Sequence, residues 1–184
     1  AQTAKTPAPG YCTDSEQGAC YSASMGGAFY VTDINTDVKL NKCEVNGYVT
    51  EPEEGLGGGI YVTTSAKLTL KDTKIKHCNA TSGGALFVGS DTTVQILQNS
   101  EISDCRSIYE AAGVYIQRAN VEIEDTTITN NFCEGDGGAA YVDAGSNFDI
   151  RTSTISLNEA ARGGGIFIGR QSIFKSSGTK YTKN

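Results

Sequence analysis

The sequence predicts an all-β solenoid, in which short strands of successive repeats lie on one another in parallel. Three observations predict it: a six-residue segment recurs six times, each copy is followed by the same pattern of short apolar strands, and no stretch has a useful helical periodicity. A repeat of about three short strands buries its apolar side chains by stacking on the next repeat.

The recurring segment consists of small residues followed by an aliphatic or aromatic triplet. Its copies read GGAFYV from Gly26, GGGIYV from Gly57, GGALFV from Gly83, AGVYIQ from Ala112, GGAAYV from Gly137 and GGGIFI from Gly163. The closing aliphatic residues are 31, 26, 28, 26 and 26 positions apart, which indicates a period near 26 residues with small insertions.

Each copy is followed by an apolar-x-apolar pair and then by one aliphatic residue. The pairs are Val38/Leu40, Leu68/Leu70, Val94/Ile96, Val121/Ile123 and Phe148/Ile150, and the single residues are Val45, Ile75, Ile102, Ile128 and Ile155. Alternation with β-branched residues, separated by Gly, Asn, Asp and Ser, is typical of short strands joined by turns. We therefore expect six to seven coils in one domain over 21–184, preceded by an extended arm and cap over 1–20 that is rich in Pro and small residues.

The Gly-Gly-small-aliphatic segment, followed by TITNN, TISLN or EISDC, resembles the right-handed parallel β-helices. Among them it is closest to the GGA(I/L/V) and FxxN repeats of polymorphic outer membrane proteins, although Ile stands here where those repeats have Phe. The resemblance covers residues from about 26 to 184 and implies a right-handed parallel β-helix. This fold carries polysaccharide lyases, adhesins and passive scaffolds alike, so function has to be argued from the surface.

Side chains alternate between the two faces of a strand, so the aromatic residue of each copy should point out of the solenoid. The resulting outward column contains Tyr30, Tyr61, Phe87, Tyr115, Tyr141 and Phe167. We interpret this aromatic ladder as an exposed apolar ridge that contacts another subunit, the arm or a glycan. The alternative is a stack that only stiffens the coil.

The six cysteines do not have zinc-ligand or redox-motif spacing, which favours structural disulfides in an oxidising compartment over buried free thiols. Cys78 and Cys105 should stack on adjacent coils and could pair. The other scheme joins sequence neighbours: Cys12 with Cys20, Cys43 with Cys78, and Cys105 with Cys133.

The segment AQTAKTPAPG is typical of a mature N-terminus, and the sequon at Asn79 is a glycosylation candidate, so we expect a secreted or cell-surface protein.

The net charge and the absence of known binding motifs limit the classes of partner and cofactor that we expect. A net charge of −6 with a pI near 4.8 argues against nucleic acid and anionic membrane surfaces, and no apolar run is long enough to cross a membrane. No HExxH, P-loop or EF-hand pattern occurs, and the one histidine, His77, lies on a predicted turn. We therefore expect no cofactor, no metal site and no catalytic residues.

The runner-up function is a polysaccharide lyase or hydrolase, because Glu122, Glu124, Asp149 and Arg151 should share one outward face. The same charges are also typical of a solvated sheet. A glycan-binding module is a further alternative. Ice binding is a minor one, because the column Lys39, Thr69, Gln95, Glu122 and Asp149 is too irregular for a threonine ladder.

The main prediction is an extracellular structural or adhesive module that forms homo-oligomers or filaments. The segment SIFKSSGTKYTKN continues the strand pattern with no capping element after it, which predicts head-to-tail stacking of coils. Contacts of the 1–20 arm with a neighbouring copy would add to this assembly.

Overall fold

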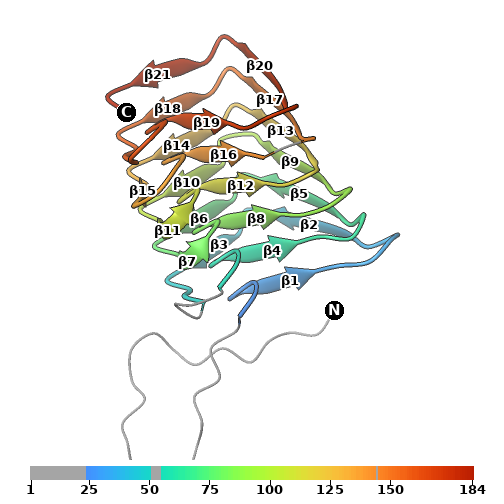
Figure 1. The fold of residues 1–184 in the computed structure, drawn as a ribbon. Coiled ribbons are helices and arrows are strands. Elements are labelled where there is room, and N and C mark those ends of the chain that lie inside the picture. The colour runs from blue at the N-terminus through green and yellow to red at the C-terminus, as the bar shows by residue number, and fades with distance from the viewer. Residues whose placement is uncertain (1–23, 51–54, 144) are drawn as a thin grey trace, which may run out of the picture.

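The fold is a stack of six coils built from short parallel strands (Figure 1). The computed structural model describes residues 24–50, 55–143 and 145–184, and these residues form 21 β-strands and no helix. The expected 1–20 arm lies outside the described residues. We number the coils 1 to 6 from the N-terminal end, so that coil 1 begins with β1 and coil 6 with β19.

Four sheets run along the stack, each formed by equivalent strands of successive coils. The first sheet contains β1 (Phe29–Val31), β4 (Ile60–Val62), β8 (Leu86–Val88), β12 (Val114–Ile116), β16 (Ala140–Val142) and β19 (Ile166–Ile168). The second sheet contains β2 (Asp37–Asn41), β5 (Lys67–Lys71), β9 (Thr93–Leu97), β13 (Asn120–Glu124), β17 (Asn147–Arg151) and β20 (Ile173–Ser177). The third sheet contains β3 (Glu44–Asn46), β6 (Lys74–Lys76), β10 (Glu101–Ser103), β14 (Thr127–Thr129), β18 (Thr154–Ser156) and β21 (Lys180–Thr182). A short fourth sheet contains β7 (Asn79–Ser82), β11 (Arg106–Glu110) and β15 (Phe132–Cys133).

The register of these strands follows the sequence repeat. Tyr61 pairs with Phe87 and Phe87 with Tyr115 in the first sheet, whereas Ile96 pairs with Ile123 in the second. The expected inward pairs form the core: Ile60 and Leu86 are completely buried, as are most of the aliphatic residues of the second and third sheets. Burial of each such side chain stabilises the coil by about 1.5–3 kcal/mol.

Left-handed backbone makes the corner between the third and fourth sheets. The residues there all have positive φ angles between 52° and 75°: Gly47, His77, Asp104, Asn130, Leu157 and Lys183. Gly, Asn and Asp adopt this conformation most easily, which explains why polar turn residues punctuate every repeat. His77 is therefore a corner residue, as the sequence predicted. Its Nδ1 lies 3.0 Å from Asn46 Oδ1.

Next to this corner, buried asparagines hydrogen-bond from coil to coil. The Asn158 Oδ1 accepts from the backbone N of Asn131 at 3.1 Å and from its Nδ2 at 2.9 Å. The Asn158 Nδ2 donates to the carbonyl of Ile128 and to Asn184 Oδ1, each at 3.0 Å. We call Asn131, Asn158 and Asn184 the asparagine ladder. It satisfies backbone groups that the tight corner leaves without strand partners.

A second ladder of hydroxyl groups lies at the corner between the second and third sheets. Its members are Thr73, Ser100, Thr126, Ser153 and Thr179. For example, the backbone N of Thr126 donates to Ser153 Oγ at 3.2 Å, while Thr126 Oγ1 donates to the carbonyl of Ile96 at 3.3 Å. The two corner ladders thus use polar side chains to fix the coil spacing.

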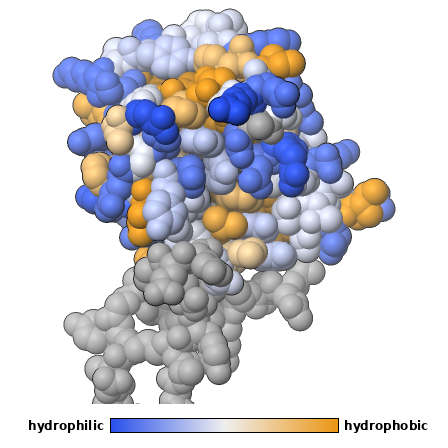
Figure 2. All heavy atoms as spheres, viewed as in Figure 1, coloured by the Kyte–Doolittle hydropathy of each residue, from blue (hydrophilic) through white to orange (hydrophobic). Residues whose placement is uncertain are grey.

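Most of the visible side of the molecule is hydrophilic, and apolar groups gather at the end formed by coil 6 (Figure 2). Ile168, Ile173 and Phe174 are exposed there, and Tyr181 is too. Within the described residues, no helix is long and apolar enough to cross a membrane.

Candidate functional site

The aromatic ladder forms a continuous column on the first sheet. Neighbouring ring centroids lie 4.9–5.3 Å apart over all six residues from Tyr30 to Phe167. The rings are stacked at both ends of the column, whereas Tyr115 meets Phe87 and Tyr141 edge to face. Both geometries are favourable for aromatic pairs. The predicted positions of the six rings on adjacent coils are therefore present in the structure.

The expectation of a continuous exposed ridge is wrong for the middle of the column. Tyr61 and Tyr115 are only 9% exposed and Phe87 is 4% exposed, whereas Tyr30 at the N-terminal end is 49% exposed. Each inner ring is covered by the rings above and below it, and Leu56 and Ala111 pack against the same cluster. The middle of the ladder is thus covered by the chain itself, Tyr141 and Phe167 are half-buried, and Tyr30 is its most exposed member.

The hydroxyl groups of the ladder point into a polar environment. Tyr115 Oη donates to Asp143 Oδ2 at 3.3 Å and accepts from Gln117 Nε2 at 3.4 Å. Burial and the negative charge of Asp143 raise the pKa of Tyr115 well above its ordinary value. Burial likewise raises the pKa of Tyr61. These phenols are therefore neutral structural groups at physiological pH.

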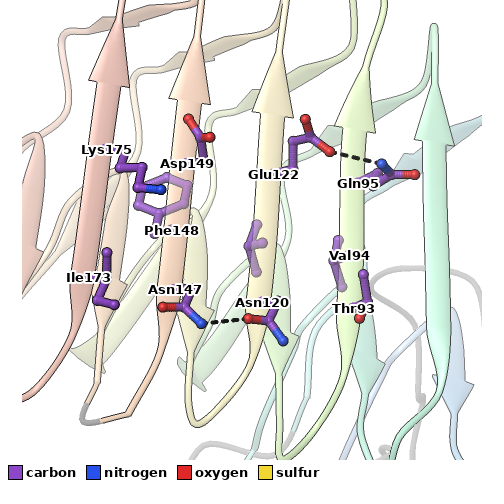
Figure 3. A pocket seen from close by; sticks show the side chains of 11 residues that line it. Thr93, Val94, Gln95, Asn120, Glu122, Asn147, Phe148, Asp149, Ile173 and Lys175 are labelled. Atoms are coloured by element: carbon purple, nitrogen blue, oxygen red, sulfur yellow. Dashed lines mark hydrogen bonds between the residues drawn. The ribbon is translucent and has the colours of Figure 1, made fainter.

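The outward side of the second sheet contains a shallow groove of about 520 Å³, which crosses coils 3 to 6 (Figure 3). Its polar lining consists of Thr93, Gln95, Asn120, Glu122, Asn147, Asp149 and Lys175, next to the apolar side chain of Ile173. Asn147 Nδ2 donates to Asn120 Oδ1 at 2.7 Å, and Gln95 Nε2 donates to Glu122 Oε2 at 2.8 Å. Sequence reasoning placed Gln95 and the acidic residues of this groove on the outward face but missed Asn120 and Asn147, because isolated Asn residues have no motif.

Arg151 joins the three carboxylates that the sequence placed on this face. Its guanidinium forms an ion pair with Glu122, lies 3.2 Å from Asp149 Oδ2, and lies 3.8 Å from Glu124 Oε2. The side chains remain between 33% and 44% exposed, so each pair contributes little to stability. Acid/base cleavage of a glycan needs two carboxylates on opposite sides of the scissile bond. Here all three carboxylates lie around one guanidinium, that of Arg151, on the exposed face of the sheet. This arrangement does not match the geometry that glycan cleavage needs.

The described cysteines have free thiols, and three of them, Cys43, Cys78 and Cys105, occupy positions of the corner ladders, whereas Cys133 lies in the fourth sheet. None of the expected pairings among them is formed, whether Cys78 with Cys105 or the neighbours in sequence. Cys12 and Cys20 lie outside the described residues. The physical reason is that each sulfur contacts a backbone carbonyl, as Cys105 Sγ contacts the Ser103 carbonyl at 3.2 Å.

Cys78 and Cys105 extend the asparagine column toward the N-terminal coils. The backbone N of Cys105 donates to Asn131 Oδ1 at 3.0 Å, and the backbone N of Cys78 donates to Cys105 Sγ at 3.4 Å. The hydrogen bond with Cys78 and burial raise the pKa of Cys105, and burial raises that of Cys133. These two thiols are therefore expected to react slowly.

We expect Cys105→Asn to stabilise the protein by about 0.5–2 kcal/mol. An amide at this position would accept from the backbone N of Cys78 and donate to the Ile75 carbonyl, which lies 4.0 Å from the sulfur. Asn131 makes the equivalent contacts one coil later, because it accepts from the backbone N of Cys105 and donates to the Ile102 carbonyl. Thermal unfolding of Cys105→Asn and of the control Cys105→Ala would check this. Equal melting temperatures for the two variants would contradict it.

Two further expectations from the sequence concern the sequon at Asn79 and metal binding. Asn79 is exposed at the start of β7, while Thr81 of the same sequon is buried. No group of three or more His, Cys, Asp or Glu residues suited to hold a metal ion occurs in the part of the chain that the structure describes.

Four stacked parallel sheets with polar ladders at the corners define a parallel β-helix protein. The family described as right handed beta helix region matches residues 19–180, and the chain belongs to this family. The predicted fold class is thereby confirmed, including its hand. No curated protein and no solved structure matches the chain. The narrower resemblance to the repeats of polymorphic outer membrane proteins stays a prediction.

Proposed function

We propose that the chain is a structural or adhesive module of an extracellular surface, in which a rigid β-helix carries binding and assembly surfaces. The observation that supports this most is the use of its polar and aromatic side chains in coil-to-coil ladders. The asparagine, hydroxyl and aromatic ladders each link several coils among the described residues. Such a rod transmits force along its axis through every coil interface.

Electron microscopy of the purified protein tests the assembly part of this proposal. Coil 6 exposes Phe174 and Tyr181 beside the edges of β20 and β21, and exposed strand edges pair with further strands. We expect filaments or end-to-end particles one β-helix wide. Uniform single particles at all accessible concentrations would contradict head-to-tail stacking.

A polysaccharide lyase or hydrolase is less well supported, because Arg151 neutralises part of the acidic cluster and holds its carboxylates together. We expect no saturable release of product from pectin, alginate or chitin-like polymers. Glu124→Gln and Asp149→Asn should leave any background rate unchanged. If product release were measurable and either substitution abolished it, the cluster would be an active site.

Glycan binding is the second candidate function, and the groove of the second sheet favours it. Amide and carboxylate groups from coils 3 to 5 lie side by side there, which suits hydrogen bonds to sugar hydroxyls. Binding of neutral oligosaccharides that is lost in Asn120→Ala, but retained in Tyr30→Ala, would place a glycan in the groove and not on the aromatic ladder.

The extracellular location is also proposed. The free thiols of the described cysteines in coils 1 to 4 weaken the disulfide argument for it, and Cys12 and Cys20 lie outside the described residues, so the proposal depends mainly on the exposed sequon at Asn79. Expression in a secretory eukaryotic host should yield a glycosidase-sensitive mass increase that Asn79→Gln abolishes.

A further inference from the structure

Charge is unevenly distributed along the outward side of the second sheet. Coils 1 and 2 present Lys39, Lys67 and Lys71 with one carboxylate, Asp37, and therefore have a charge of +2 on this face. Coils 4 and 5 present the three carboxylates around Arg151, which leaves a charge of −2. Coil 3 lies between them with three uncharged outward residues, Thr93, Gln95 and Leu97. Over coils 1 to 5 the face is thus positive on coils 1 and 2, negative on coils 4 and 5 and neutral on coil 3, while coil 6 adds one cation, Lys175.

We propose that two copies of this chain associate face to face through the second sheet, about a two-fold axis parallel to β9. This rotation exchanges coil 2 with coil 4 and coil 1 with coil 5, and it preserves the position along each strand. Lys71 and Glu124 are both the last residues of their strands, and Lys39 and Asp149 are both the middle residues. Lys71 therefore faces the partner's Glu124, and Lys39 faces the partner's Asp149, with each pair occurring twice.

The other exchanged positions bring no like charges together. Lys67 meets the partner's Asn120, and Thr69 meets the partner's Glu122. At the remaining two positions a charge again meets an amide: Asp37 faces the partner's Asn147, and Arg151 faces the partner's Asn41. On the axis, Leu97 meets its own copy and adds an apolar contact. Charge complementarity of this kind specifies orientation and partner more than it adds affinity.

The surface relief fits the same arrangement. The groove of Figure 3 lies over coils 3 to 6, between the first and middle outward positions of the strands. The two-fold axis places the partner's Lys39 and Lys67 over the stretch of groove on coils 4 and 5, where the carboxylates of Glu122 and Asp149 form part of the wall. A second copy therefore covers the part of the groove on coils 3 to 5 and places basic side chains over its acidic wall.

A polyanionic glycan is the competing occupant of the basic half. It would leave the acidic half and the groove unused, whereas a second copy accounts for both. The dimer is lateral, so it is independent of the head-to-tail stacking under the proposed function. A face of five strands, each five residues long, is small, and we expect the dimer to be concentration-dependent and to dissociate at high salt.

Charge exchange tests this dimer by sedimentation equilibrium at low and high ionic strength. The parent should dimerise at low salt, and Lys71→Glu or Glu124→Lys alone should weaken dimerisation by about tenfold or more, because repulsion replaces attraction twice per dimer. The double variant with both substitutions should recover most of the association, since the pairs are restored with reversed sign. Lys175→Glu is the matched control, because coil 6 lies beyond the exchanged coils.

Mixed samples give a second readout. Lys39→Glu/Lys71→Glu should associate with Glu124→Lys/Asp149→Lys, while neither variant associates with itself. Circular dichroism checks that each variant keeps the fold. A parent that stays monomeric at low salt, or a double variant as monomeric as the single ones, overturns the proposal. A monomeric parent that binds heparin, and loses that binding in Lys71→Glu, also overturns it and assigns the basic half to a polyanion.

Discussion

Asn158→Ala should lower the free energy of unfolding by about 3–5 kcal/mol, because it leaves several buried groups of two coil interfaces without hydrogen bonds. Asn158 is 1% exposed, and it accepts two hydrogen bonds from Asn131 and donates to the Ile128 carbonyl and to Asn184. An alanine methyl group replaces none of these contacts.

Urea unfolding followed by circular dichroism measures this loss. Asn120→Ala is the matched control: it removes the same amide from an exposed strand position, where Asn120 accepts one hydrogen bond from Asn147. Its cost should stay within about 0.5 kcal/mol, as for most surface substitutions. Similar losses for the two variants would mean that the asparagine ladder only fills space.

The unfolding curve of Asn158→Ala should also become broader. Stability of a solenoid is a sum of coil terms and nearest-neighbour interfaces, so a weak interface between coils 5 and 6 allows the last coil to open separately. A transition that stays sharp, with an unchanged denaturant slope, would indicate that coils 5 and 6 remain coupled by the strands alone.

The sequence was sufficient to predict the stacked coils because two periods reinforce each other. Alternation over two residues assigns Val121 and Ile123 to the core, and the repeat near 26 residues places them beside Val94 and Ile96, as observed. The short fourth sheet was missed. Its strand β7 has the sequence NATS, in which buried Ala80 and Thr81 give no apolar alternation to detect.

The exposure of the aromatic ladder could not be predicted from these sequence patterns. Alternation correctly places Tyr61 and Tyr115 outside the core, but it does not tell whether something covers them. Their cover comes from the neighbouring rings and from Leu56 and Ala111, which lie outside the named strands; Leu56 forms isolated parallel bridges with Met25 and Ser82. Exposure depends on such long-range packing, which a local pattern does not contain.

The predicted disulfide between Cys78 and Cys105 was wrong for a related reason. Equal spacing correctly predicted that Cys78 and Cys105 stack on adjacent coils, and from this stacking we expected that they could form a disulfide. In the structure, the same positions in later coils carry Asn131 and Asn158, so the column requires hydrogen-bonding groups directed at the backbone. The two sulfurs each contact a backbone carbonyl, and the thiols interact by a hydrogen bond without forming a disulfide. The hydrogen bonds that this column makes to the backbone, and not the number of cysteines, explain why these thiols are free.

Tyr115→Ala should destabilise the protein by about 3–5 kcal/mol, the range for deleting a buried aromatic side chain. Its ring contacts Phe87 and Tyr141 edge to face, so its removal opens a gap in the middle of the aromatic ladder. The substitution also removes the hydrogen bond to Asp143. Tyr30→Ala is the control at the exposed end: Tyr30 stacks only on Tyr61, and we expect it to cost about 1 kcal/mol or less.

Comparing these two variants separates a stiffening stack from a contact surface. If the ladder mainly holds coils together, thermal unfolding should fall steeply for Tyr115→Ala and hardly at all for Tyr30→Ala, while light scattering shows the same particle mass for both. If the ladder is a contact with another subunit or a glycan, the exposed Tyr30 is the member that a partner can reach. Tyr30→Ala would then reduce assembly or binding with little change in melting temperature. A small thermal effect for Tyr115→Ala, equal to that of Tyr30→Ala, would show that the inner rings are not the stabilising stack that their burial indicates.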